Sequence, residues 1–315
     1  MYSLFEELDD SARQLQSDWR AIVRYLLSTE AHVYAFAIAA NVMIAFWPFM
    51  LVMISLFRNV LHWPTAELAI YVGVKDYFPG RVGGFLSYNL NLLAPTSHRV
   101  EWLSLVLLLF TANGVFLPLE VALNKAWGVK ENRSLLKNQV VSMGLIFACG
   151  GLALLSAALG GAAQAAWLEA TGQSLQTLRD QLTAYNAVSA APPLLMMAAK
   201  LASVPMTILS LLLVYLYLPN TKVPVRVVLP RAILVGVALE LLKWINLGVW
   251  PWVQTKFSRE FGVFVNSVTI LTWSFLAGLV VLAGAEWTAH RARAAARLEC
   301  AARETKEGLE PGPEV

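Results

Sequence analysis

Long runs of hydrophobic residues alternate with short charged segments along most of the chain. The run 31–57 contains no Asp, Glu, Lys or Arg, and five further runs carry few charges or none. A helix needs about 20 apolar residues to cross a bilayer, and hydrocarbon admits only backbone that satisfies its own hydrogen bonds. We therefore predict an all-α polytopic membrane protein with a six-helix transmembrane bundle. The predicted spans are about 31–57, 102–119, 139–160, 193–218, 232–254 and 264–287.

The segment 1–30 has a different pattern. Hydrophobic residues recur at spacings of three and four from Phe5 to Leu26, and acidic and basic residues fill the opposite face. This spacing is typical of an amphipathic helix. Such a helix lies on the inner membrane surface or packs beneath the bundle. A homotypic coiled coil is the alternative, with only three heptads to hold it together.

The segments outside the spans divide the chain into three regions, 1–30, 31–290 and 291–315. The longest external loop, 58–101, contains two apolar stretches separated by Pro and Gly residues, so we expect two short amphipathic helices at the outer interface. The loop at about 161–192 is expected to behave similarly. The region 291–315 begins with arginines and ends in Pro and Gly residues, which predicts a basic and then disordered tail.

Lys and Arg residues orient the predicted spans. With both termini in the cytoplasm, the inner segments hold 15 of these residues and the external loops hold 7. Cytoplasmic loops of membrane proteins are enriched in Lys and Arg. We therefore predict that both termini are cytoplasmic.

Composition supports a membrane protein and excludes other classes. Only 14% of the residues are charged and 57% are hydrophobic, with a mean hydropathy of +0.57, whereas a soluble domain has about 25% charged residues. An ordinary soluble enzyme and a long disordered protein are both excluded. The net charge of +3 is too small to indicate a nucleic-acid partner. Two cysteines, Cys149 and Cys300, exclude a disulfide scaffold and a four-cysteine zinc site.

Motifs for catalysis are missing from the sequence. The four histidines are not paired at metal-ligand spacing, and no Cys-x-x-Cys, His-Glu-x-x-His or phosphate-binding glycine loop is present. A two-metal hydrolase would need several convergent carboxylates or histidines. We therefore predict no catalytic residues, no metal and no cofactor.

Three polar residues within the spans are the candidates for an intramembrane site. Glu240 and Lys243 are three residues apart and can pair on one helix face, and Asn113 lies in a stretch that also contains Gly114 and Pro118. Charges at membrane depth are costly and are usually functional or paired. We expect the pair to face the bundle, toward Asn113 or a water-filled cavity. A purely structural pair and a simple helix kink are the alternatives.

Three arginines follow the last span closely, Arg291, Arg293 and Arg297. Basic residues at this depth attract anionic lipid headgroups. We predict that these arginines contact anionic lipids. The alternative is a plain cytoplasmic anchor, for which the positive charge alone is sufficient.

Further signals lie in short motifs spread over about 30–290. Gly262 is followed by Trp273 eleven residues later and by Gly284 eleven residues further, with Glu286 directly after. The other matching positions are Pro48, Asn124, Gly128, Arg133 and Pro219. In these motifs the chain resembles the YihY/BrkB family of bacterial inner-membrane proteins, also labelled UPF0761 and formerly ribonuclease BN.

Two departures from the family pattern stand out. Phenylalanines occupy positions 257 and 261, where the family often has tyrosines. The chain reads Pro230-Arg231-Ala232 where the family usually has Pro-Gly-Ala, which adds a positive charge at the inner end of the fifth span.

The resemblance implies a multi-pass protein of the bacterial inner membrane and leaves three functions to weigh. A transporter or lipid-handling protein of the cell envelope is favoured, with membrane lipids as partners and a small molecule or a lipid as substrate. A structural or regulatory envelope protein is the alternative. A ribonuclease is disfavoured, because the chain lacks clustered metal ligands and a basic groove. The sequence specifies no oligomeric state.

Overall fold

The fold is all-helical throughout the part of the chain that the structure describes, as the hydrophobic runs predict. A computed structural model describes residues 16–78, 81–93, 98–129, 133–170, 201 and 203–307. Within these ranges there is no β-strand. Residues 171–192 of the predicted loop, residues 308–315 of the predicted tail and the first half of the predicted N-terminal helix lie outside them. Residues 291–307 of the predicted tail are helical and continue α11.

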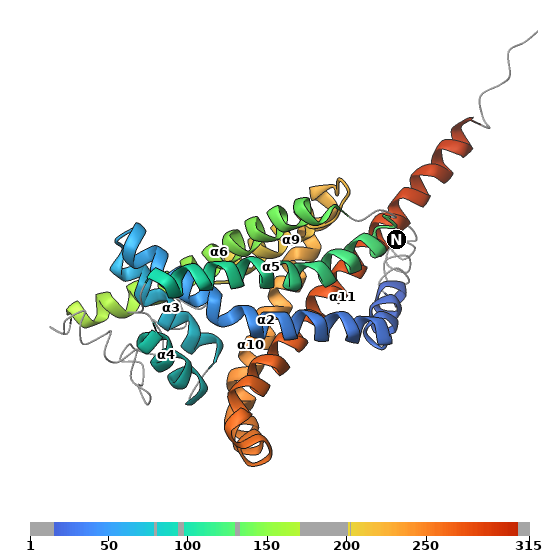
Figure 1. The fold of residues 1–315 in the computed structure, drawn as a ribbon. Coiled ribbons are helices and arrows are strands. Elements are labelled where there is room, and N and C mark those ends of the chain that lie inside the picture. The colour runs from blue at the N-terminus through green and yellow to red at the C-terminus, as the bar shows by residue number, and fades with distance from the viewer. Residues whose placement is uncertain are drawn as a thin grey trace, which may run out of the picture.

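The helices extend beyond the predicted spans at most of their ends (Figure 1). A short helix over 16–26 comes first. The remaining helices are α2 (Thr29–Ser55), α3 (Pro64–Tyr77), α4 (Arg81–Leu93), α5 (His98–Ala126), α6 (Leu135–Ala170), α9 (Ser203–Tyr217), α10 (Val225–Phe261) and α11 (Val265–Glu307). A π-helical turn, Leu56–Val60, ends α2, and a 3-10 turn, Gly262–Phe264, links α10 to α11.

Three segments within the described ranges are long and apolar enough to cross a membrane. They are Thr29–Val60, Leu136–Ser156 and Val265–Ala294, and α9 is a shorter apolar helix. The helices α5 and α10 contain 29 and 37 residues, which at about 1.5 Å per residue exceeds the roughly 30 Å hydrocarbon core. The count of six spans stays a prediction.

The helix α2 lies at the centre of the bundle. It packs against α5 along one side and against α11 along another, while α10 packs against α9 and α11. Figure 1 shows α2, α5 and α6 running side by side, with α10 and α11 crossing behind them. The helix α6 joins the two groups, because it contacts α3, α5 and α9.

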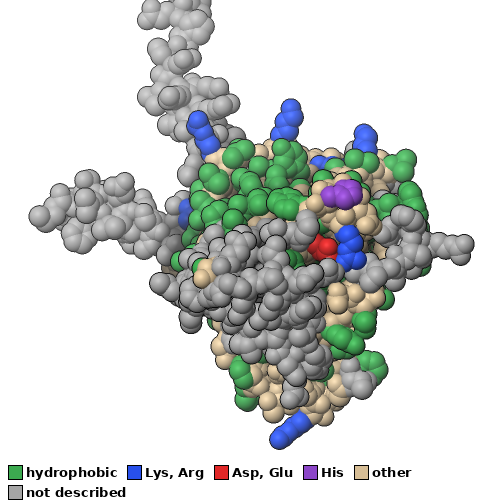
Figure 2. Space-filling model, turned by 90° about the vertical axis from the view of Figure 1, so that its left-hand side faces the viewer, with side chains coloured by type: hydrophobic (Ala, Val, Ile, Leu, Met, Phe, Trp, Pro, Cys, Tyr) green, Lys and Arg blue, Asp and Glu red, His purple; other side chains and the backbone are tan. Residues whose placement is uncertain are grey.

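The two helices found in the predicted external loop 58–101 differ in burial. On α4, Val82, Leu86 and Leu90 form one buried face, and Tyr88 is exposed, as in an amphipathic helix. In contrast, α3 is buried around most of its circumference and packs against α6. It is therefore part of the hydrophobic core, because its apolar residues, 68–74, are too continuous to leave a polar face. Figure 2 looks onto this end of the molecule, where hydrophobic side chains are common and charged ones are few.

The helix over 16–26 buries one residue of its predicted polar face. Periodicity assigned Asp18 to that face, but in the structure Asp18 is 3% exposed. The reason is a set of polar contacts that Asp18 makes with α11, described below. Trp19, on the predicted apolar face, is 65% exposed at the protein surface, which is compatible with the predicted contact of that face with the membrane. The helix ends at Leu27, and the Ser28 hydroxyl caps α2 by accepting a hydrogen bond from the Ala31 N–H at 3.2 Å.

Candidate functional site

The predicted charged pair of α10 is buried and has polar partners on α9. The Nζ atom of Lys243 lies 2.8 Å from an Oε atom of Glu240, and the two side chains are 11% and 8% exposed. The Thr207 hydroxyl donates to the other carboxylate oxygen at 2.7 Å, and the Ser203 hydroxyl does so at 3.2 Å. Lys243 also donates to the Ser203 hydroxyl at 3.2 Å. Four side chains from two helices therefore form one polar cluster inside an apolar bundle.

This arrangement explains how the charges are accommodated. An isolated charge at membrane depth is expensive, whereas a hydrogen-bonded pair neutralises itself.

The sequence also contained a signal for the two hydroxyls that was missed. Ser203 and Thr207 are four residues apart, so they share one face of an otherwise apolar helix. Asn113, the third predicted member, belongs to α5, and its side chain lies outside the described residues.

A second polar cluster joins the end of α5 to the loop after α9. The buried Asn124 accepts a hydrogen bond from the Asn220 N–H through its side-chain oxygen at 2.7 Å. Arg133 donates to the carbonyl oxygens of Tyr217, Leu218 and Pro219 at 2.9–3.1 Å. These carbonyls follow the last turn of α9, where helical partners are missing. We call Asn124, Arg133 and residues 217–220 the α5–α9 clamp.

Gly128 turns the chain from α5 into this clamp. Its φ angle is +72°, a conformation that a side chain disfavours. The Val129 N–H donates to the Asn124 carbonyl at 2.8 Å and the Gly128 N–H donates to the Lys125 carbonyl at 3.0 Å. This pair of bonds is a Schellman motif, which satisfies the last carbonyls of a helix. The motif positions Asn124, Gly128, Arg133 and Pro219 thus meet in one place.

Arg133→Ala is expected to destabilise the folded protein by about 2–4 kcal/mol, because three carbonyls lose a charged donor. Arg133→Lys should recover part of this loss, since an ammonium cannot span the three acceptors as a guanidinium does. Unfolding followed by tryptophan fluorescence in one detergent would measure both. Arg226→Ala, at an exposed arginine, is the control. Equal stability of the Arg133 and Arg226 variants would contradict the clamp.

Gly284 and Glu286 lie on α11 near the same end of the bundle. A Cβ at Gly284 would lie 2.3 Å from a methyl group of Val235 and 2.5 Å from the Tyr215 hydroxyl. Only glycine therefore allows α9, α10 and α11 to approach so closely. The buried Tyr215 hydroxyl donates to the Val281 carbonyl at 2.7 Å. Glu286 pairs with Arg293 at 2.7 Å.

Two adjoining polar cavities lie beside the start of α2. The larger is also bordered by the helix over 16–26 and α11, and the smaller by the end of α5 and α11. Their volumes are about 500 Å³ and 210 Å³, and they share Tyr25, Glu30, Glu286 and Arg293 in their walls. Lys125 reaches Glu30 at 2.6 Å across the smaller one. Burial, followed by the charges of Glu286 and Glu30, raises the pKa of Tyr25 above its usual range. The Tyr25 phenol is therefore neutral and can act as a hydrogen-bond donor.

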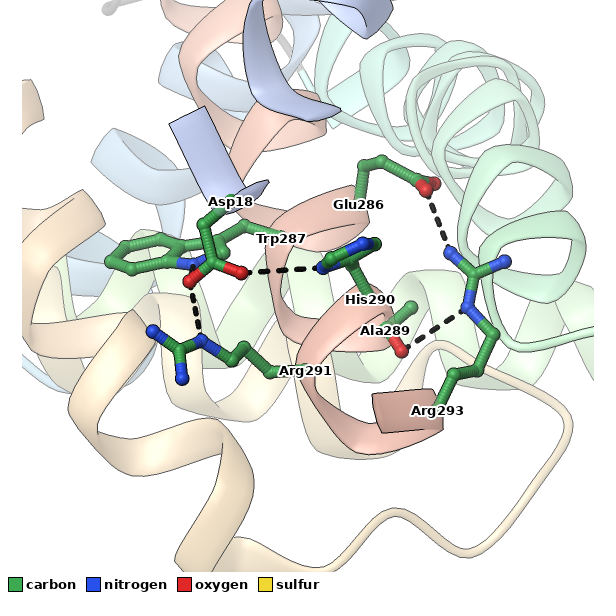
Figure 3. Close-up of polar contacts among 7 residues, drawn as sticks. All are labelled: Asp18, Glu286, Trp287, Ala289, His290, Arg291 and Arg293. Carbon is green, nitrogen blue, oxygen red and sulfur yellow. Dashed lines mark hydrogen bonds and ion pairs between the residues drawn. The ribbon is translucent and has the colours of Figure 1, made fainter. Parts of the chain in front are cut away.

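Asp18 fastens the N-terminal helix to α11 (Figure 3). Its carboxylate accepts hydrogen bonds from the Trp287 indole N–H at 2.9 Å and from Nε of Arg291, and it lies 3.3 Å from Nδ1 of His290. Figure 3 shows these side chains projecting from α11 toward Asp18, with the Glu286–Arg293 pair on the other side of the helix. We call this contact the Asp18 latch. Polarity alone placed Asp18 on the solvent face, and no local pattern in the sequence indicates this contact.

The remaining predicted positions lie apart from these clusters. Pro48 is buried within α2, and Trp273 packs in the hydrophobic core near α3. Gly262 has a φ angle of +52° and ends α10. Of the predicted lipid-contacting arginines, Arg291 and Arg293 each pair with a carboxylate. The Arg297 side chain lies outside the described residues. Within the described part of the chain, no group of three or more His, Cys, Asp or Glu residues is placed to hold a metal ion.

Comparison with known proteins gives one family. The family model described as Virulence factor BrkB matches residues 22–307. Several similar proteins are named UPF0761 membrane protein. One from Paraburkholderia xenovorans is 22% identical over 77% of this chain and 52% of its own length. One from Pseudomonas aeruginosa is 23% identical over 84% of this chain and 60% of its own length. One from Pseudoalteromonas translucida is 20% identical over 90% of this chain and 89% of its own length.

The extent of these matches differs between relatives. The chain spans about half to three fifths of the length of the first two relatives, and nearly the whole of the third. The family match begins at residue 22, so Asp18 lies just outside it. No solved structure matches the chain.

Proposed function

Because the chain belongs to the BrkB family of membrane proteins, we propose that it is a transporter or lipid-handling protein of the bacterial cell envelope. In this proposal it resides in the inner membrane with six spans and cytoplasmic termini. The 15-to-7 distribution of Lys and Arg supports this orientation. The substrate is a lipid or a small molecule that crosses or enters the bundle between its helices.

The buried polar cluster of α9 and α10 carries the proposal. Glu240 and Lys243 are held by hydroxyls that could be exchanged for those of a substrate. A protein that needed only a rigid scaffold would gain stability from apolar residues at these positions, because buried ion pairs rarely beat a well-packed core. Retaining two charges there favours a role in which a polar group passes or binds.

The cluster is tested by moving a lipid through a reconstituted membrane. Wild-type protein in vesicles of phosphatidylglycerol and phosphatidylethanolamine, containing a trace of fluorescent phospholipid, is expected to expose inner-leaflet label to an external quencher. The double variant Glu240→Gln with Lys243→Gln is expected to fold normally and to lose this activity. Lys256→Gln, at an exposed lysine of the same helix, is the control and should behave as wild type.

Two outcomes would decide against the proposal. If wild-type protein moves neither the fluorescent lipid nor water-soluble solutes trapped in the vesicles, transport is rejected. If the double variant moves lipid as fast as the wild type, the polar cluster is structural. A structural or regulatory role would then be the better interpretation. Identifying the proteins that purify together with this chain would test that role.

A further inference from the structure

An apolar groove lies between the helix over 16–26, α10 and α11. Its volume is about 380 Å³, within the range of about 300–1,000 Å³ that small-molecule sites occupy. Ile22 and Leu26 form one wall, Leu234 and Leu242 of α10 form another, and Leu279 of α11 contributes a third. None of the residues that line it is charged, so the groove suits a hydrocarbon chain.

A charged residue continues each wall at the inner end of the groove. Asp18 comes four residues before Ile22, Arg231 comes three before Leu234, and Arg291 comes four after Trp287, which also lines the groove. Residues three or four apart share one helix face. The three charges are therefore on the groove-lining faces and just beyond its apolar part. Arg231 is also the residue that departs from the family's Pro-Gly-Ala pattern.

The length of the groove matches one leaflet. Leu242 comes eleven residues after Arg231, which corresponds to about 16 Å along the helix at 1.5 Å per residue. Half of a hydrocarbon core of about 30 Å is about 15 Å. An acyl chain that follows α10 from the charged end would therefore stop near the middle of the bilayer.

The charges at the mouth of the groove leave an excess of one positive charge. Arg291 uses Nε toward Asp18, and Arg231 uses one terminal nitrogen toward the Val227 carbonyl at 2.9 Å. Each guanidinium has five N–H donors in all. His290 is the other titratable group that faces Asp18. Burial, followed by the positive charge of Arg291, lowers the pKa of Arg231, and the negative charge of Asp18 acts in the opposite direction.

We propose that this groove binds one anionic glycerophospholipid of the inner leaflet, with an acyl chain between α10 and α11 and its phosphate between Arg231 and Arg291. An anion there would balance the second positive charge, because Asp18 is the one carboxylate beside the two arginines on the groove-lining faces of the described helices. A free phosphate would not use the groove, and a second copy of the chain would have to bring an anion to the same point. This proposal rests on the proposed function only for the class of ligand, a lipid. It concerns where a lipid binds and not whether the protein moves it across the membrane.

Native mass spectrometry of the full chain released from nanodiscs tests the site. The discs contain equal amounts of phosphatidylglycerol and phosphatidylcholine. Wild-type protein is expected to retain one phosphatidylglycerol in preference to phosphatidylcholine. Arg231→Gln and Arg231→Gly should each reduce that preference about fivefold, as expected from about 1 kcal/mol per arginine. Arg226→Gln, an exposed arginine on the first turn of the same helix, should leave it unchanged.

A third variant tests the groove itself. Ala238→Trp places a large side chain among the lining residues and is expected to remove the retained lipid of either kind. The proposal is overturned if Arg231→Gln and Arg226→Gln lower retention equally, or if Ala238→Trp keeps the lipid. It is also overturned if Ala238→Trp dissociates a dimer that carries no lipid, because the groove would then bind a second copy. Loss of lipid transport with normal retention would reject the proposed function and keep this site.

Discussion

Lys243→Gln alone is expected to destabilise the protein by about 3–5 kcal/mol, more than the double variant Glu240→Gln with Lys243→Gln. The single change leaves the Glu240 carboxylate buried without its cation, and removing one partner of a buried pair costs about this much. In the double variant both groups are neutral amides that can still bond with Ser203 and Thr207. The double variant should therefore lose less than about 2 kcal/mol of stability.

Unfolding of the purified variants by a denaturing detergent, followed by tryptophan fluorescence, measures these differences. Lys256→Gln is the control for removing a lysine from α10 where it is exposed. Its Nζ lies 5.5 Å from the centre of the Trp252 ring, so the change should cost no more than about 1 kcal/mol. A double variant as unstable as the single variant would contradict this account. It would mean that the cost comes from the bonds to α9 and not from the unpaired charge.

The helical fold follows from the sequence because membrane solvation leaves few alternatives. A run such as 31–57 has no charges and must satisfy its own backbone, so a helix is the physical answer. The position of α3 was less predictable. Its apolar stretch is too short to be identified as a span, and only the packing against α6 decides that it belongs to the core.

The candidate site was predictable only in part. Spacing alone showed that Glu240 and Lys243 could reach each other, because three residues place them on one face. The meeting of Arg133 with residues 217–219 joins segments about 85 positions apart, and no local pattern carries that information. The buried Asp18 shows the limit of periodicity, which ranks side chains by polarity. A carboxylate with several donors can be buried, as Asp18 is.

Asp18→Ala is expected to release the helix over 16–26 from α11 while the rest of the bundle stays folded. The change removes the bonds from Trp287 and Arg291, and hydrogen bonds to a charged group contribute about 1.5–3 kcal/mol each. Because Arg291 keeps some access to water, we expect the free energy that holds this helix on α11 to fall by about 3 kcal/mol in total. Amide hydrogen exchange within 16–26 should then become about 100-fold faster.

Glu286→Gln is the matched control for the Asp18 latch. It breaks the neighbouring pair with Arg293, whose side chain is 48% exposed, and a solvent-accessible pair of this kind contributes about 1 kcal/mol. Exchange in 16–26 should therefore change little in this variant. If Asp18→Ala also leaves that exchange unchanged, then Ile22 and Leu26 hold the helix without the latch. If exchange rises in 16–26 alone, the polar contacts hold the helix over the groove.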